Sequence, residues 1–325
     1  MLIQENALAG HYSFPGAGAS GYLVQASRAM HGCQSFVANR DLHSGSVNSA
    51  SPATHRRIIL VNRVLNVILS HQSRDQLERL LAWWSCCAPV EDLLIAYGGQ
   101  EEEFKKLPDV SRVFVSDPRL RVDKTRKKQS YSGVWRAAAH WLTEKGRESF
   151  THVYFAEFDH LPIVPDLAEK LLDRAEKERA DVLGHGLRRV DGTSNVHYLY
   201  HLSDPAFLRF WRRISVRPDK EVVLHMVATG SFWRQKAFMD VAAQGEEISA
   251  YLEIYLPTLA HHLGFRLRDF GNQEQCVSTL PIEGMTVDKA RRAGCWTVHP
   301  IKSTPPISAA RPKRVYSRES GVPCH

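Results

Sequence analysis

Residues 152–159 decide the fold, and they read His152-Val153-Tyr154-Phe155-Ala156-Glu157-Phe158-Asp159. The apolar run Val153–Ala156 is typical of a short strand that is buried on both faces. The run ends in two carboxylates that are separated by one residue, and alternation along a strand places residues i and i+2 on the same side. The sequence therefore predicts that Glu157 and Asp159 point toward one site.

Two carboxylates at this spacing suit a hard divalent cation, and such a cation can offset the charge of a diphosphate. An acidic pair of this kind also occurs as the solvated end of an ordinary strand. The motif has only three residues, so alone it favours the second interpretation. The order of the other motifs along the chain favours the first interpretation, a cation site.

Apolar runs alternate with helical patterns on both sides of this strand. The patterns predict strands over 58–69, 93–97 and 113–115, and helices over 75–84 and 134–142. The resulting order from residue 58 to about 190 is β-α-β-β-α-β-α. An alternation of this kind predicts an α/β fold, Rossmann-like, with a mostly parallel central sheet covered by helices on both faces and with ligands beyond the carboxyl ends of the strands.

The second half of the chain is less regular. Helices are predicted over 206–214, 233–243 and 251–263, and Gly264 is well placed to end the last of them. We expect one domain over 56–302, preceded by a disordered or loosely attached leader over 1–55 and followed by a basic, proline-containing tail over 303–325. A transit peptide is the alternative interpretation of the leader, although it is poor in arginine.

The composition excludes several classes of protein. The chain has 325 residues, of which 43% are hydrophobic and 24% charged, and these values are ordinary for a globular protein. No apolar run approaches the ~20 residues that span a bilayer. The six cysteines show no CxxC pair, so a zinc ribbon or a disulfide framework is not expected, and we interpret them as reduced thiols in a cytoplasmic protein.

The net charge of +7 is unevenly distributed along the chain. Residues 119–128 hold six basic groups and one acidic group, and residues 288–325 hold eight and two, so these segments sum to +11 and the remainder to −4. This distribution favours recognition of a compact anion over general binding to nucleic acid.

Several motifs occur in the order found in one enzyme family. The motifs are Val67–Gln72, Gln76–Trp84, Leu93–Gly98, Glu157–Asp159, Thr229–Phe238, Glu253–Leu267 and Trp296–Lys302. Together they resemble the GT-A fold nucleotide-sugar glycosyltransferases, particularly the inverting, family 2-like enzymes. The resemblance covers roughly residues 60–302 and divides the domain into a nucleotide-sugar-binding half, 56–190, and an acceptor-side half, 191–302.

The resemblance implies roles for individual residues. Asp159, with Glu157 assisting and His299 as a third ligand, would bind Mn²⁺ or Mg²⁺. The residues implied to contact the nucleotide and its diphosphate are Ser70, His71, Gln72, Tyr97, Arg126 and Lys302, with Lys124 as an alternative to Arg126.

On the acceptor side, the resemblance implies contacts from Gly230, Ser231 and Trp233, and a general base at Glu253. Two departures from the family pattern matter. The metal motif begins with Glu157 where the family has Asp, and the family's Glu-Asp pair is Glu253-Ile254 here. The second departure leaves Glu246 and Glu247 as competitors for the base.

The function implied by the resemblance is a metal-dependent, inverting transfer of sugar from a nucleoside-diphosphate donor, with a UDP sugar preferred, to a hydroxyl of a carbohydrate or glycolipid acceptor. Envelope or capsule polysaccharide synthesis at the inner face of a membrane is compatible with the basic tail. No nucleic-acid partner is expected, and the oligomeric state is left open.

Three other functions compete with this one. A sugar-phosphate nucleotidyltransferase would have a Gly-rich loop after the first strand, and residues 70–74 contain no glycine. A basic protein that binds RNA or an anionic surface would explain the charge, but no recognition motif accompanies it. A glycosyltransferase fold that binds without turnover is consistent with the missing half of the Glu-Asp pair.

Overall fold

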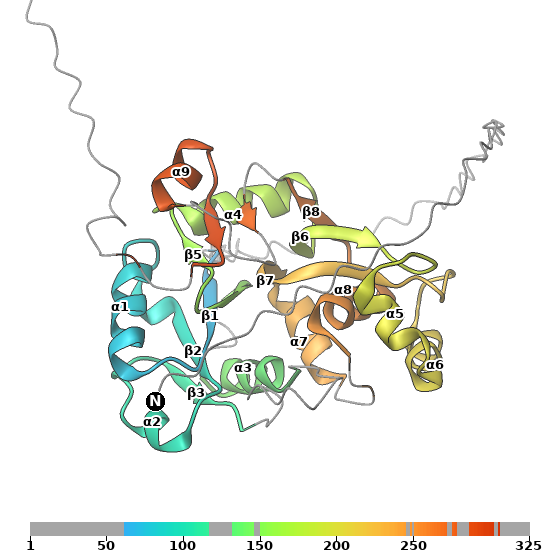
Figure 1. Ribbon diagram of the computed structural model, residues 1–325, viewed down its shortest axis with the longest axis horizontal. Helices are drawn as coiled ribbons and strands as arrows, with labels where there is room; N and C mark the ends of the chain where they lie inside the picture. Colours follow the sequence, from blue (N-terminus) through green and yellow to red (C-terminus); the bar gives the residue numbers. More distant parts are fainter. Residues whose placement is uncertain are drawn as a thin grey trace, which may run out of the picture. The chain divides into compact units, whose positions relative to one another are not determined.

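A computed structural model describes residues 62–116, 132–145, 150–244, 248, 250–271, 275–277, 286–301 and 305 (Figure 1). The chain divides between Arg57 and Ile58, and all described residues belong to the later part. The predicted leader, 1–55, and the predicted tail, apart from residue 305, lie outside the described residues.

Ten strands and nine α-helices are found in the described part of the chain. The strands are β1 Val64–Ser70, β2 Leu93–Tyr97, β3 Arg112–Phe114, β4 His152–Glu157, β5 Leu161–Pro162, β6 Val182–Arg189, β7 Leu224–Arg234, β8 Leu267–Phe270, β9 Gln275–Val277 and β10 Thr297–His299. The helices are α1 Arg74–Trp84, α2 Glu101–Lys105, α3 Ser132–Lys145, α4 Leu167–Lys177, α5 Val196–Leu202, α6 Pro205–Ile214, α7 Gln235–Ala243, α8 Leu252–His262 and α9 Val287–Arg292, and a 3₁₀ turn, Val90–Asp92, precedes β2.

Seven strands form the central sheet in the order β3-β2-β1-β4-β7-β6-β8. The pairs β3–β2, β2–β1, β1–β4 and β6–β8 are parallel, whereas β7 is antiparallel to both β4 and β6. Six strands therefore share one direction and only β7 runs against them. The prediction of a mostly parallel sheet is confirmed. A second, smaller sheet has the order β5-β10-β9.

The strands bury both faces, and alternate residues enter different cores. In β4, Val153 and Phe155 join a cluster with residues of α3, α6, α7 and α8. Tyr154 and Ala156 join a second cluster with residues of α1, α4 and α9. Figure 1 shows α4 and α9 on one side of the strands and α3 and α7 on the other. The predicted cover of helices on both faces is confirmed.

Local sequence signals explain where several helices begin and end. Ser73 caps α1 in a capping box with Gln76, whose side chain accepts from the Ser73 backbone amide at 3.1 Å. Asp204 caps α6, where its carboxylate accepts from the amide of Ala206. Gly264 follows the end of α8 with φ of +94°, as predicted, because a residue without Cβ adopts this conformation without strain.

Three predictions about the elements were wrong. The helix expected over 233–243 begins at Gln235, because Trp233 and Arg234 complete the long strand β7. Neither β7 nor β6 was predicted as a strand, since glycines interrupt both sequences. The predicted β-α-β-β order also omitted the short helix α2 between β2 and β3.

Two smaller expectations concern membranes and cysteines. Among the described helices, none is long and apolar enough to cross a bilayer. Cys86, Cys87 and Cys295 are free thiols, in agreement with the prediction for these three positions.

Candidate functional site

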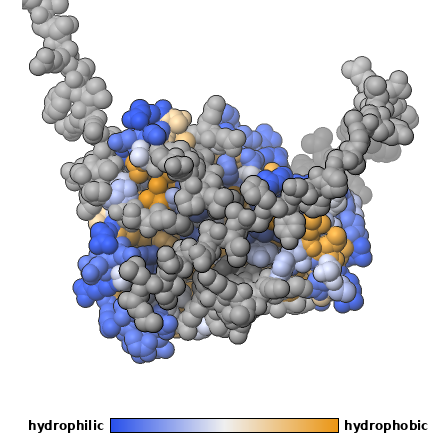
Figure 2. Space-filling model, in the orientation of Figure 1, coloured by the Kyte–Doolittle hydropathy of each residue, from blue (hydrophilic) through white to orange (hydrophobic). Residues whose placement is uncertain are grey.

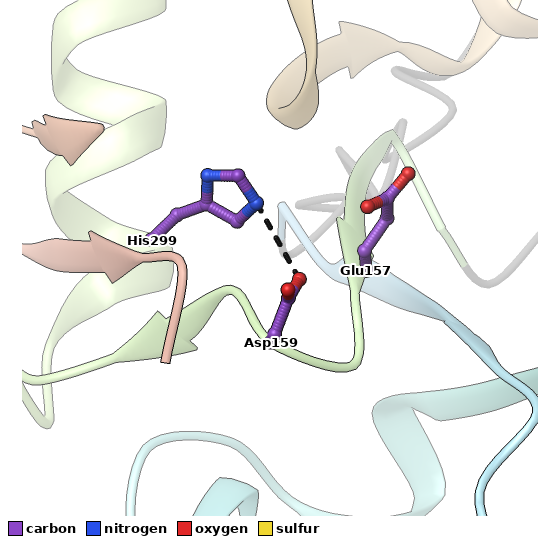
Figure 3. A group of neighbouring side chains, drawn as sticks. All are labelled: Glu157, Asp159 and His299. Atoms are coloured by element: carbon purple, nitrogen blue, oxygen red, sulfur yellow. Dashed lines mark ion pairs between the residues drawn. The ribbon is translucent and has the colours of Figure 1, made fainter. Parts of the chain in front are cut away.

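Three of the predicted metal ligands lie together at the carboxyl end of β4 (Figure 3). Glu157 is the last residue of the strand, and Asp159 lies in the turn that follows it. His299 is the last residue of β10, and its ring faces Asp159. One ligand atom from each residue lies within 4.8 Å of the others. The fold thus brings His299 next to Asp159, although the two residues are 140 positions apart along the chain.

Backbone hydrogen bonds fix this arrangement. The amide of Phe158 donates to the carbonyl of Leu69 at 2.9 Å, which holds the end of β4 against the end of β1. The amide of Ile301 donates to the carbonyl of Asp159 at 2.8 Å. Strand β10 pairs antiparallel with β5, directly after the turn, through Thr297↔Pro162 and Val298↔Leu161. The small sheet therefore lies next to the turn that contains Asp159 and places His299 beside that residue.

The geometry suits one divalent cation. His299 Nε2 lies 3.4 Å from Asp159 Oδ1, and their side chains are 12% and 4% exposed. Ligands on opposite sides of a cation with bonds of about 2.0–2.6 Å are separated by about 4–5 Å, so the three residues fit one coordination sphere. Two carboxylates suit Mg²⁺ or Mn²⁺, and the imidazole favours Mn²⁺ of the two.

His160 supports this group and was not among the predicted site residues. Its ring stacks on that of His299 with centroids 5.5 Å apart, and its Nε2 is hydrogen-bonded to the hydroxyl of Tyr154 at 3.2 Å. Complete burial lowers the pKa of His160 well below the usual value, and His299 lowers it further. His160 is therefore a neutral ring that packs behind a candidate ligand. Its place directly after Asp159 was the available sequence signal.

The end of β1 borders the group. The ring of His71 contacts that of Phe158 edge-on at 4.7 Å, and His71 itself is exposed. Ser70 is fully buried, and its hydroxyl accepts from the amide of Gln72 at 3.2 Å. His71 and the half-buried Gln72 are consequently available for contact with a ligand, whereas Ser70 has a local structural role.

Tyr97 is buried in the core. Its side chain is 1% exposed and packs against the ring of Phe104 with centroids 6.1 Å apart, and burial raises the pKa of its hydroxyl. The implied contact between Tyr97 and a nucleotide stays a prediction. The residue is a member of the core on the α1 and α4 side of the sheet.

The implied acceptor residues are also part of the core. Trp233 is fully buried against Trp135, and its indole N–H donates to the hydroxyl of Ser231 at 2.9 Å. Ser231 in turn donates to the carbonyl of Ala228 at 2.6 Å. Gly230 has φ of +75°, and a Cβ at this position would lie 2.1 Å from the His160 ring. These three residues stabilise β7 and pack behind the site, and the acceptor role implied for them stays a prediction.

The predicted base, Glu253, lies half-buried in the first turn of α8. It is close enough to Tyr251 to raise the pKa of that hydroxyl, after burial and Tyr200. The ring of Tyr251 packs on His197 at 4.7 Å. Glu253 thus belongs to an aromatic and histidine cluster. The other candidate residues, Glu246, Glu247, Lys124, Arg126 and Lys302, lie outside the described residues.

The described site combines three side chains whose geometry suits a cation with an exposed imidazole and a neighbouring amide at the end of the first strand. Such a combination can hold a divalent ion and an anion that bridges to it. No family model matches the chain and no curated protein matches it, so the group formed by Glu157, Asp159 and His299 is what points to a function.

Proposed function

We propose that the chain is a divalent-metal-dependent glycosyltransferase that uses a nucleoside-diphosphate sugar. The observation that carries this proposal is the convergence of Glu157, Asp159 and His299 at the carboxyl end of a parallel strand. A bound cation would supply positive charge for the diphosphate leaving group. The carboxyl edge of a parallel sheet is also where α/β folds bind nucleotides.

In this proposal, different residues of the chain would bind the cation, contact the nucleoside and act as the general base. Asp159, which is almost fully buried, and His299 would hold the cation, and Glu157 would complete the group from the end of β4. His71 and Gln72 would contact the nucleoside beside it. Glu253 would take the proton of the acceptor hydroxyl as general base, which implies inversion at the anomeric carbon. A UDP sugar as donor and a carbohydrate or glycolipid as acceptor belong to this proposal, as does a cytoplasmic location.

The first experiment measures ligand-dependent stability. We expect Mn²⁺ with UDP to raise the melting temperature of the wild-type chain and Asp159→Asn to abolish the rise, because the buried carboxylate is lost. Asp109→Asn is the matched control, since this exposed loop residue lies far along the chain from the group and the same charge is removed. An equal rise in both variants would exclude Asp159 as a ligand.

The second experiment measures turnover. Nucleotide sugars with UDP, GDP or CMP leaving groups are incubated with the chain and Mn²⁺, and release of the nucleotide is followed. Release from one donor class that is lost in Asp159→Asn supports a transferase. Binding of UDP with Mn²⁺ but no release from any donor would instead favour the fold that binds without turnover.

A further inference from the structure

A second charged region lies in the other half of the sheet. It is a groove of about 440 Å³ between β6, the start of β7, the end of α8 and the start of β8. Among the described residues, its walls carry five arginines and one carboxylate, that of Asp181. The arginines are Arg188, Arg189, Arg217, Arg266 and Arg268.

Two of these arginines are held in place by the fold. Arg217 donates to the carbonyls of His261, Gly264 and Phe265 at 2.6–3.2 Å, so it satisfies acceptors left over where α8 ends. Arg189 pairs with Asp191 at 2.7 Å and with Asp219 at 2.9 Å. Arg217 is therefore fixed by backbone carbonyls, and the charge of Arg189 is compensated by two carboxylates.

The other three arginines have no acidic partner within the described residues. Arg266 donates to the carbonyl of Arg179 and Arg268 to that of Leu267, each at 3.0 Å, and Arg188 makes no ion pair with a described residue. Asp181 does not neutralise them, since its carboxylate is shared between Arg234 at 3.1 Å and the backbone amide of Arg266. The groove thus gathers cations whose charge the described residues leave uncompensated.

A histidine also lines the groove. The pKa of His261 is lowered to about 4, mainly by burial, and His262 and Arg217 make smaller contributions to this shift. His261 is therefore neutral at physiological pH and adds a polar ring to the wall without adding to the repulsion. The wall offers guanidinium donors, and no carboxylate in it is left to bind a cation.

We propose that this groove binds a polyvalent phosphate anion. Guanidinium groups match phosphate oxygens in bidentate geometry, and several of them around one groove suit a ligand with more than one phosphate group. The volume is also larger than one phosphate needs. The site differs from the group at Asp159 in requiring no metal ion, and its existence does not depend on the proposed transferase activity. The phosphates could belong to a soluble molecule or to lipid headgroups at a membrane surface.

The test titrates the full-length chain with inorganic tripolyphosphate by calorimetry in metal-depleted buffer without EDTA, because EDTA is itself a polyanion. We expect Arg266→Gln together with Arg268→Gln to weaken binding by roughly tenfold per arginine removed. Arg79→Gln with Arg209→Gln is the matched control, since both are exposed helix arginines and the same charge is removed. Equal losses in the two double variants, or no binding by the wild type, would overturn the proposal.

Two further measurements separate the groove from the metal site and identify the source of phosphate. Asp159→Asn should bind tripolyphosphate as the wild type does, whether or not the transferase proposal holds, and loss of binding in this variant would overturn a separate groove. Sedimentation with phosphatidylcholine vesicles, with and without phosphatidic acid, tests for headgroups. Vesicle binding that needs Arg266 and Arg268 assigns a membrane surface, and tripolyphosphate binding without vesicle binding assigns a soluble ligand. Binding of neither probe contradicts the proposal.

Discussion

The two halves of the central sheet gather charges of opposite sign. In the half formed by β3, β2, β1 and β4, the parallel strands end beside the carboxylates of Glu157 and Asp159. In the half formed by β7, β6 and β8, the edge of the sheet and the end of α8 gather five arginines. Among the described residues, the fold therefore assembles carboxylates at one place and arginines at another.

The difference has a structural cause. The first half presents a turn after β4, where short acidic side chains can meet a histidine delivered by β10. The second half presents the carbonyl end of α8, whose partial negative charge favours a cation such as Arg217. Strand β7 joins the halves, because Trp233 pairs with Val153 of β4 on one side and with Val182 of β6 on the other.

The largest expected effect on the free energy of unfolding comes from replacing Trp233, the residue of β7 that pairs with both halves of the sheet. Trp233→Ala removes a fully buried ring that packs on Trp135 at 4.7 Å, and we expect a loss of about 3–5 kcal/mol in the free energy of unfolding. Urea denaturation followed by circular dichroism measures it. Trp233→Phe keeps an aromatic ring and loses the hydrogen bond to Ser231, so its cost should be smaller. Two separate transitions in the wild type would show that the halves unfold independently.

The second prediction concerns the contact between Gly230 of β7 and the ring of His160, which packs behind His299. In Gly230→Ala the new Cβ would lie 2.1 Å from the His160 ring at φ of +75°, so backbone strain and overpacking together should cost about 2–4 kcal/mol. Gly192→Ala is the control, because Gly192 has φ of +73° and open space around it, and only strain of about 1 kcal/mol is expected. Denaturation midpoints compare the two. An equal loss in both variants would mean that His160 moves aside without cost.

The sequence predicted the first half of the fold better than the second. Strand β2 is an uninterrupted apolar run, and β1 and β4 are largely apolar, a pattern that burial on both faces produces directly. Strand β7 contains Gly230 and Ser231, which are typical of turns, but the glycine is required there by the His160 ring. A tertiary contact therefore imposed a residue that local propensity assigns to a loop.

The candidate site was likewise predicted only in part from the sequence. The sequence singled out the acidic pair, but strand alternation does not relate the two residues, because β4 ends at Glu157 and Asp159 lies in the following turn. His299 was found only through a resemblance, because nothing local connects it to Asp159. The arginine groove was missed, since its five arginines come from three places in the sequence, at residues 188–189, 217 and 266–268, and none of these is a long basic run. Counting charge by segment finds clusters along the chain and cannot find clusters that the fold assembles.

An intermediate effect is expected when the free energy of unfolding is measured as a function of pH. Burial lowers the pKa of His225 in β7 to about 4, with Arg188 and His197 adding to the shift. The unfolded chain takes up this proton near pH 6.5, so the stability due to neutral His225 is present above that pH and is lost as the pH falls toward 4. After allowance for solvent screening, the loss is about 1–2 kcal/mol. His225→Gln should flatten the stability profile between pH 6.5 and 4. His140→Gln is the control, because the side chain of His140 is 71% exposed, and a profile flattened equally by both variants would rule out the burial of His225 as the cause.

The smallest effect is the most specific test of the charge difference. Arg188→Gln removes one of several uncompensated cations, so at low salt it should leave the free energy of unfolding unchanged or raise it by up to about 0.5 kcal/mol. Lys236→Gln removes the same charge from an exposed pair with Asp240 at 2.7 Å and should lower the free energy by about 0.3–0.5 kcal/mol. High salt should remove both effects, because it screens exposed charges. A loss of stability in Arg188→Gln comparable to that in Lys236→Gln would show that Arg188 is compensated, and the second half of the sheet would then lack the excess of positive charge that distinguishes it from the first.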